Sequence, residues 1–134
     1  MSASALPEAA GQDPVLFHEI PARGGRRIGV ATLNSPQTLN GLSLPMCRLL
    51  DARLQAWAAD DGLVAVVLNG AGGKAFCAGG DLHALYRAML ESPADDAWAN
   101  VTARAFFETE YRLDHRIHRY SKPVLCWASG IVKI

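Results

Sequence analysis

The pattern of apolar and polar positions divides the chain into alternating strands and helices. Two mostly apolar runs, Val15 to Ile20 and Arg27 to Leu33, flank a glycine-rich turn at 21–26 and predict a β-hairpin. Residues 63–68 contain no polar side chain, which is typical of a strand covered on both faces. Residues 124–128 form a second apolar run and predict another strand of the same kind.

Three further segments have helical spacing. Apolar residues recur three or four positions apart between residues 46 and 57, and Ser43 can cap that helix at its start. Residues 82–90 predict a short amphipathic helix, and a longer one is expected from about residue 95 to 120. In that longer helix, Glu108 and Arg112 are four apart and could pair. The alternation of strands and helices predicts an α/β fold.

Composition narrows the class of protein. The chain has 134 residues, half of them hydrophobic, and its formal net charge is zero, so nucleic acid is not an expected partner. Cys47, Cys77 and Cys126 fit no disulfide framework or zinc spacing, and we expect reduced thiols in a cytoplasmic protein. No apolar run approaches the ~20 residues that span a bilayer, so no membrane partner is expected. We expect residues 1–13 to be a disordered lead-in and residues 14–134 to form the domain.

The segment with most chemical content is Lys74 to Asp81, which reads Lys-Ala-Phe-Cys-Ala-Gly-Gly-Asp. It joins a buried strand to a helix, so backbone N–H groups at the helix start lack intrahelical partners. The glycine pair allows a ligand to approach the main chain closely. Such donors suit an oxygen that gains negative charge during a reaction, which favours acyl chemistry over metal or nucleotide chemistry. The alternative is a tight turn that binds nothing.

Three stretches, in the same order along the chain, resemble the amino-terminal part of the crotonase, or enoyl-CoA hydratase/isomerase, superfamily. They are residues 34–42, which resemble its proline-to-asparagine loop, residues 70–81, which resemble its first oxyanion loop, and residues 122–130, which resemble the strand before its second. The resemblance covers roughly residues 14–132. It implies a crotonase-like ββα spiral core, truncated at the carboxyl end, so that 14–134 is a partial domain.

Two details are similar to the 3-hydroxyisobutyryl-CoA hydrolase branch, which hydrolyses an acyl-CoA thioester in valine breakdown. One is the Phe-Cys-Ala-Gly-Gly-Asp form of the loop, and the other is the Phe-Phe-x-x-Glu-Tyr pattern at residues 106–111. The glutamate of that pattern lines the acyl pocket in the branch and matches Glu110. An enoyl-CoA hydratase or isomerase is the first alternative, and a non-catalytic module that binds an acyl-CoA or a protein is the second.

The resemblance also implies roles for individual residues. The thioester carbonyl accepts two backbone N–H bonds in the family, the first from the residue matching Gly80, and these stabilise the transition state. The residues expected to hold the substrate beside Glu110 are Gln37, Leu39, Ala78, Gly79, Asp81 and Leu82. Coenzyme A is then part of the substrate, and neither a separate cofactor nor a metal is implied. Family members commonly form trimers or larger assemblies, which leaves a homo-oligomer open.

Part of the family pattern is missing from the printed sequence. A second donor should come from a Gly-Gly-Gly turn about five residues past Gly130, where this sequence reads Ile-Val-Lys-Ile. The catalytic acids of the hydrolases lie still further on. We therefore expect a complete family member to hydrolyse the thioester and these 134 residues not to do so alone.

Four side chains near these motifs have simpler interpretations. Asp81 suits a helix cap better than a catalytic acid. Cys77 is more consistent with a packed thiol than with a nucleophile, because no histidine is placed to activate it. His115 and His118 share a helix face without an evident third ligand, which favours a solvated basic face over a metal site.

Overall fold

The structure, a computed structural model, describes residues 13–93, 96 and 99–133. The expected lead-in, apart from Asp13, lies outside the described residues. The helices and strands, in chain order, are β1 (Val15–Pro21), η1 (Arg23–Gly25), β2 (Arg27–Leu33), η2 (Pro36–Thr38), α1 (Leu44–Ala58), β3 (Leu63–Gly70), β4 (Ala75–Cys77), α2 (Leu82–Glu91), α3 (Val101–His118), β5 (Val124–Cys126) and β6 (Ile131–Val132).

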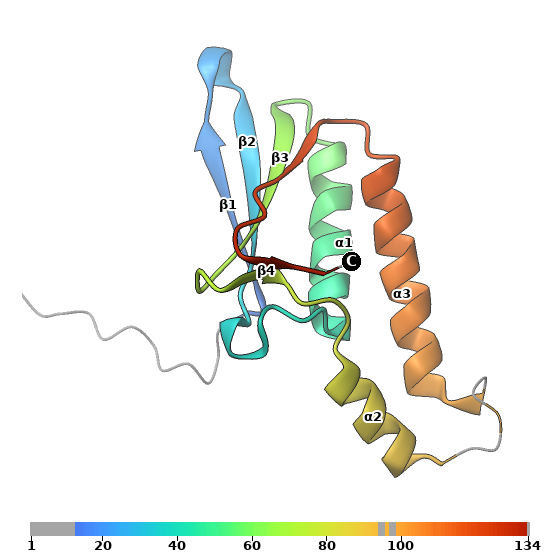
Figure 1. The fold of residues 1–134 in the computed structure, drawn as a ribbon. Coiled ribbons are helices and arrows are strands. Elements are labelled where there is room, and N and C mark those ends of the chain that lie inside the picture. The colour runs from blue at the N-terminus through green and yellow to red at the C-terminus, as the bar shows by residue number, and fades with distance from the viewer. Residues whose placement is uncertain (1–12, 94–95, 97–98, 134) are drawn as a thin grey trace, which may run out of the picture.

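The main sheet has four strands in the order β1-β2-β3-β5. β1 and β2 form the predicted antiparallel hairpin, in register from Val15 opposite Leu33 to Pro21 opposite Arg27. β3 joins β2 in parallel, and β5 joins β3 in parallel. α1 and α3 lie on the same side of this sheet, and α2 lies near one end of it (Figure 1). The α/β prediction is confirmed.

α1 covers the sheet with one apolar face. Its buried residues are Met46, Cys47, Leu50, Leu54 and Trp57, which match the predicted helical spacing except that Cys47 is added and Leu49 is only partly buried. The Ser43 hydroxyl accepts the Met46 N–H at 3.3 Å, so the predicted cap is confirmed. Together with apolar side chains of β1, β2 and β3, this face of α1 forms the core.

α3 packs along α1 and begins later than the sequence suggested. Asn100 has an extended backbone, and its side chain accepts the Ala103 N–H at 3.0 Å, so the helix starts at Val101. The predicted start near residue 95 is too early, and residue 95 itself lies outside the described residues. Glu108 forms an ion pair with Arg104, one turn before it, at 3.9 Å.

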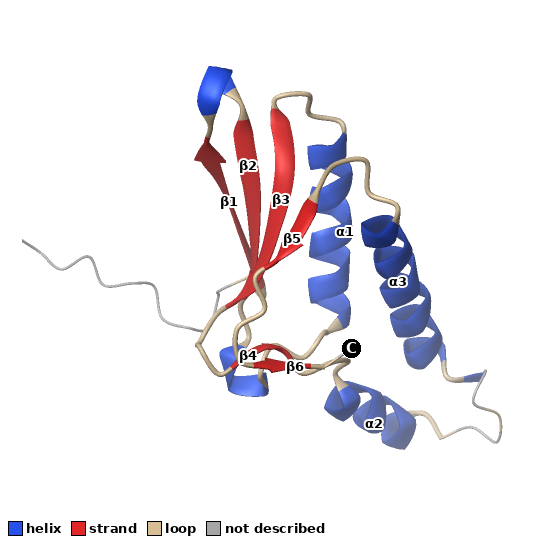
Figure 2. Cartoon of the chain, turned by 45° about the horizontal axis from the view of Figure 1, so that its top comes forward, coloured by secondary structure: helices blue, strands red, loops and turns tan. Residues whose placement is uncertain are grey.

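A second, two-stranded sheet lies at the end of the main sheet, beside α2 (Figure 2). It consists of β4 and β6, which run parallel, and it was not predicted. Strands of three and two residues are too short to show an alternating pattern. β5 also ends two residues earlier than predicted, at Cys126. Trp127, just beyond it, is 68% exposed.

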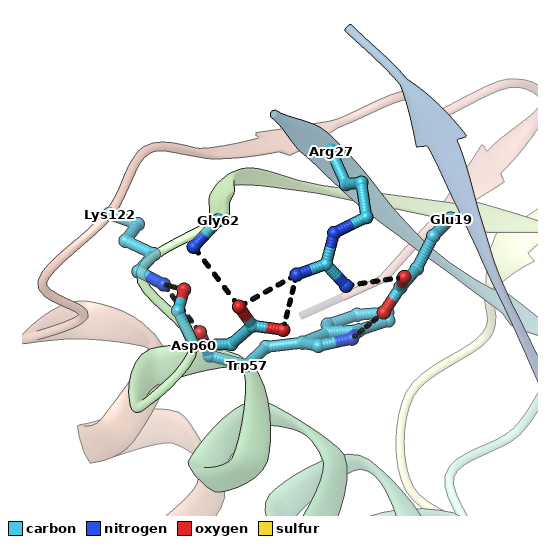
Figure 3. Close-up of polar contacts among 6 residues, drawn as sticks. All are labelled: Glu19, Arg27, Trp57, Asp60, Gly62 and Lys122. Carbon is cyan, nitrogen blue, oxygen red and sulfur yellow. Dashed lines mark hydrogen bonds and ion pairs between the residues drawn. The ribbon is translucent and has the colours of Figure 1, made fainter. Parts of the chain in front are cut away.

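A polar cluster ties the hairpin to the carboxyl end of α1 (Figure 3). The Arg27 guanidinium donates to Glu19 on β1 and to both carboxylate oxygens of Asp60, at 2.7 Å each for the latter. The indole N–H of Trp57 donates to the other oxygen of Glu19 at 3.2 Å. The Lys122 ammonium donates to the carbonyls of Trp57 and Asp60, where the helix ends. The cluster therefore fixes the end of α1 against β1, β2 and the segment before β5.

Candidate active site

The glycine-rich turn after β4 is held by the loop that precedes α1. Ala78 donates its N–H to the Leu39 carbonyl at 3.0 Å. Leu42 donates to the Gly79 carbonyl at 2.7 Å and accepts the Asp81 N–H at 2.8 Å. The residues on both sides of Gly80 are thus hydrogen-bonded to a second segment of backbone.

These hydrogen bonds involve the residues on both sides of Gly80 but not Gly80 itself. In a parallel pairing, one residue directs both its N–H and its C=O to the neighbouring strand, and its partner turns both groups away. Leu42 is the residue that uses both groups here, so Gly80 turns its N–H away from Leu42. Among the described residues, no hydrogen bond uses the Gly80 N–H, whereas its carbonyl accepts the Leu82 N–H at 2.9 Å. The turn therefore presents one backbone donor whose neighbours are fixed.

The face of Gly80 is covered by α3. A Cβ added at Gly80 would lie 3.4 Å from the Phe106 ring and 4.0 Å from a Glu110 carboxylate oxygen. Both residues belong to the Phe-Phe-x-x-Glu-Tyr pattern, and four residues along a helix bring them to the same face. Phe106 is buried and Glu110 is half-buried. The structure thus brings the two sequence motifs together.

The Glu110 carboxyl lies in a poorly solvated and negatively charged place. Burial raises its pKa, and the charge of Asp114, one turn further along α3, raises it further. Burial also raises the pKa of Asp114. A raised pKa makes a carboxyl a better proton donor near neutral pH, which is a property of many catalytic acids and of many buried structural acids.

Two side chains of the turn have structural tasks. Asp81 accepts the Ala84 N–H at 3.0 Å and caps α2, as its simpler interpretation predicted. The Cys77 thiol is buried and accepts the Gly79 N–H at 3.4 Å. Burial raises the pKa of this thiol, which disfavours the reactive thiolate. Within the described part of the chain, no group of three or more His, Cys, Asp or Glu residues is placed to hold a metal ion.

Of the other residues that were predicted to hold the substrate, only some lie beside Gly80. Leu39 meets the turn through its carbonyl. Gln37 is exposed on η2, and no hydrogen bond of the described residues joins it to the turn. The Leu82 side chain lines a separate groove of about 1010 Å³ between α2 and α3. Tyr111 lines the same groove, but Gly80 and Glu110 do not.

Asn40 belongs to the loop that holds the glycine-rich turn, and no role was predicted for it from the sequence. Its side chain is fully buried, at 0% exposure, and bonds the segments before η2 and after β3. Leu39 and Asn40 both have left-handed backbone conformations, with φ of 54° and 55°. The Asn-Gly pair at 40–41 was a signal for that conformation, since asparagine adopts it more readily than most residues.

Comparison with known proteins places this geometry in a family. The family described as enoyl-CoA hydratase/isomerase matches residues 28–132. The chain therefore belongs to the enoyl-CoA hydratase/isomerase family, and the recognition of the crotonase superfamily is confirmed.

Individual relatives refine the placement. The chain is 39% identical over 117 residues to the mitochondrial 3-hydroxyisobutyryl-CoA hydrolase of Danio rerio, covering 87% of this chain and 28% of that protein. It is 44% identical over 103 residues to the protein of the same name from Mus musculus, covering 77% of this chain and 25% of that one. The chain thus spans between a quarter and a third of the length of these curated relatives.

Solved structures confirm the crotonase-like fold. A carnitinyl-CoA dehydratase from Mycobacterium thermoresistibile superposes with a TM-score of 0.76 at 40% identity, over 90% of this chain and 32% of that one. An enoyl-CoA hydratase from Rhodobacter sphaeroides gives a TM-score of 0.72 at 33% identity, over 87% of this chain and 32% of that one. Among the described residues, no helix has both the length and the apolar character required to cross a membrane.

Proposed function

We propose that this chain provides the first oxyanion donor and part of the acyl pocket of a 3-hydroxyisobutyryl-CoA hydrolase. The observation that carries the proposal is the Gly80 N–H, which has fixed neighbours, no hydrogen-bond partner among the described residues, and Glu110 beside it. The similarity to curated hydrolases supports the choice of an acyl-CoA thioester as substrate.

In the proposed reaction, water adds to the thioester carbonyl, the C–S bond breaks, and the products are a carboxylic acid and the thiol of coenzyme A. Negative charge develops on the carbonyl oxygen during the addition. The Gly80 N–H would donate to that oxygen, and one such donor is typically worth ~3 kcal/mol of transition-state stabilisation. Glu110 would line the pocket on the acyl side. Because an oxyanion site with one donor lacks much of its catalytic power, these 134 residues should bind the thioester without turning it over.

Calorimetry tests the binding step. The chain should bind 3-hydroxyisobutyryl-CoA more tightly than free coenzyme A, which has the same nucleotide and pantetheine arm but no acyl group and so no thioester carbonyl. Equal affinity for the two ligands, or none for either, would refute the placement of the carbonyl at Gly80. Assays for released thiol should show no turnover by the chain alone.

A hydratase or dehydratase is the second candidate, because the dehydratase structure is about as similar to this chain as the curated hydrolases are. The two activities can be compared in a protein that carries this segment together with the carboxyl-terminal portion of a full-length relative. Release of coenzyme A from 3-hydroxyisobutyryl-CoA supports the hydrolase. Hydration of crotonyl-CoA without thiol release rejects it.

We further propose a cytoplasmic location. The three cysteines are free, as expected in a reducing compartment, but the curated relatives are named as mitochondrial proteins. Cell fractionation distinguishes the two compartments. Sedimentation velocity would show whether the chain forms a homo-oligomer.

A further inference from the structure

The loop between β2 and α1 contains a buried amide side chain that joins three segments of backbone. The Asn40 carbonyl oxygen accepts the Ser35 N–H at 2.9 Å. Its amide nitrogen donates to the carbonyls of Ala71 at 3.0 Å and Ala75 at 2.9 Å. One side chain thus fixes the start of its own loop, the turn after β3 and the first residue of β4.

The surrounding backbone is shaped to admit this side chain. A Cβ added at Gly70 would lie 2.8 Å from the Asn40 amide nitrogen, closer than real side chains approach. The same Cβ would lie 2.6 Å from the Phe76 carbonyl oxygen and 2.9 Å from that of Ala75, so a glycine is needed where β3 ends because these carbonyls and the amide together occupy the space. The tight loop requires left-handed backbone conformations at Leu39 and Asn40, and these conformations are uncommon in residues other than glycine. Strain of this kind persists where the surroundings over-determine it.

The residues next to Asn40 are the ones that hold the glycine-rich turn. The carbonyl of Leu39 accepts the Ala78 N–H, and Leu42 bonds to Gly79 and Asp81. Asn40 therefore lies between its own anchors on the β3–β4 turn and the backbone groups that fix both sides of Gly80. A shift of the loop at Asn40 would move these groups and reorient the Gly80 N–H.

We propose that Asn40 is the positioning residue that aims the Gly80 amide at the thioester carbonyl. The proposal rests on the function proposed above and deepens it, since Asn40 acts through the backbone of Leu39 and Leu42 without touching the substrate. An oxyanion donor is effective only when it is pre-aimed, because reorganisation during the reaction would cost part of its stabilisation.

Asn40→Asp is the first test, since it keeps the shape and the acceptor for Ser35 but removes both donated hydrogen bonds. Asn69→Asp is the matched control, because its side-chain oxygen accepts the Thr32 hydroxyl at 2.6 Å and a carboxylate still can. In the full chain, amide hydrogen exchange of Ala78 and Asp81 should become at least about tenfold faster in Asn40→Asp only. Exchange in the paired strands of the main sheet should change much less.

A second measurement follows the substrate. The carbonyl stretching frequency is measured by vibrational spectroscopy with the wild-type chain saturated by a ¹³C-carbonyl acyl-CoA. It should move to lower frequency because the carbonyl accepts the Gly80 N–H. The Asn40→Asp variant should lose most of that shift. A residue that only stabilised the fold would not move this frequency in chains that remain folded. If wild-type chain shows no shift, the proposed function fails, and the exchange experiment still decides the role of Asn40.

Asn40→Gly serves if the buried carboxylate prevents folding, because glycine accepts the left-handed backbone of this position. It should give the same local loss of protection as Asn40→Asp. Unchanged exchange at Ala78 and Asp81 in a folded variant would overturn the proposal. Unfolding of both variants, or equal loss of protection in the turn and the main sheet, would also overturn it, since Asn40 would then support the whole fold.

Discussion

Replacing Gly80 by proline removes the one N–H on which the proposed site depends. Gly80→Ala is its control, because both variants add a Cβ but only alanine keeps the N–H. That Cβ would lie 3.4 Å from the Phe106 ring, a tight contact that both variants share. The φ of Gly80 is outside the left-handed region, so an L-residue is admissible there. The difference between the two variants therefore isolates the donor.

The expected magnitude follows from the kind of hydrogen bond that is lost. A neutral N–H donating to a ground-state carbonyl contributes ~1 kcal/mol, so the Kd of a CoA thioester should rise about fivefold in Gly80→Pro relative to Gly80→Ala. In a protein that joins this chain to the carboxyl-terminal part of a relative, the bond strengthens as charge develops, and kcat/KM should fall ~100-fold or more.

Calorimetry measures the first value and released thiol the second, with circular dichroism to confirm that both variants fold. Proline and alanine variants with the same Kd and the same kcat/KM would refute the reasoning, because the N–H would then do nothing for the carbonyl. A loss confined to Kd would also count against an oxyanion role, since uniform binding does not raise kcat.

The remaining predictions concern the cluster of Figure 3. Lys122→Met should lower the free energy of unfolding by ~1–2 kcal/mol, because it removes hydrogen bonds from a charged donor but leaves both carbonyls with a backbone partner. The control, Lys74→Met on the exposed turn, should change the free energy of unfolding little. Urea denaturation that shows equal stability for the two variants would contradict this prediction. Hydrogen bonds from Arg27 hold the pKa values of Glu19 and Asp60 below their ordinary 4.5 and 3.8. The stability that these carboxylates contribute is therefore present above those values and is lost as the pH falls through the lower pKa values of the folded state. Asp60→Asn should reduce this loss of stability at acid pH in urea titrations, and an unchanged loss would rule out the linkage.

Local chemistry is what the sequence predicted well. Ser43 and Asp81 cap their helices as expected, because a cap needs only a short polar side chain and the next three residues. The hairpin was also predicted correctly, since both strands and the turn at 21–26 are adjacent in the chain. The family motifs also predicted that Gly80 and Glu110 lie close together, and a Cβ at Gly80 would be 4.0 Å from a Glu110 oxygen; spacing alone could not provide this pairing.

Long-range pairing is what the sequence did not reveal. β4 and β6 are too short for a pattern and find each other only in three dimensions. Asn40 resembled any polar loop residue, and its importance lies in carbonyls more than thirty positions away. The start of α3 was misplaced because several acidic and amide residues precede it and any of them could have capped the helix.

The pairing of β4 with β6 has a consequence for the order of assembly. The Lys133 N–H donates to the Cys77 carbonyl at 2.9 Å, so the backbone that leads into the glycine-rich turn gains this partner only from the segment that follows β5. Closing so long a loop costs more chain entropy than closing the hairpin. During synthesis on the ribosome, the hairpin and α1 can form while residues 131–133 are still in the exit tunnel. The backbone that leads into the glycine-rich turn containing Gly80 accordingly gains this hydrogen bond only after the hairpin and α1 that support the turn have been synthesised.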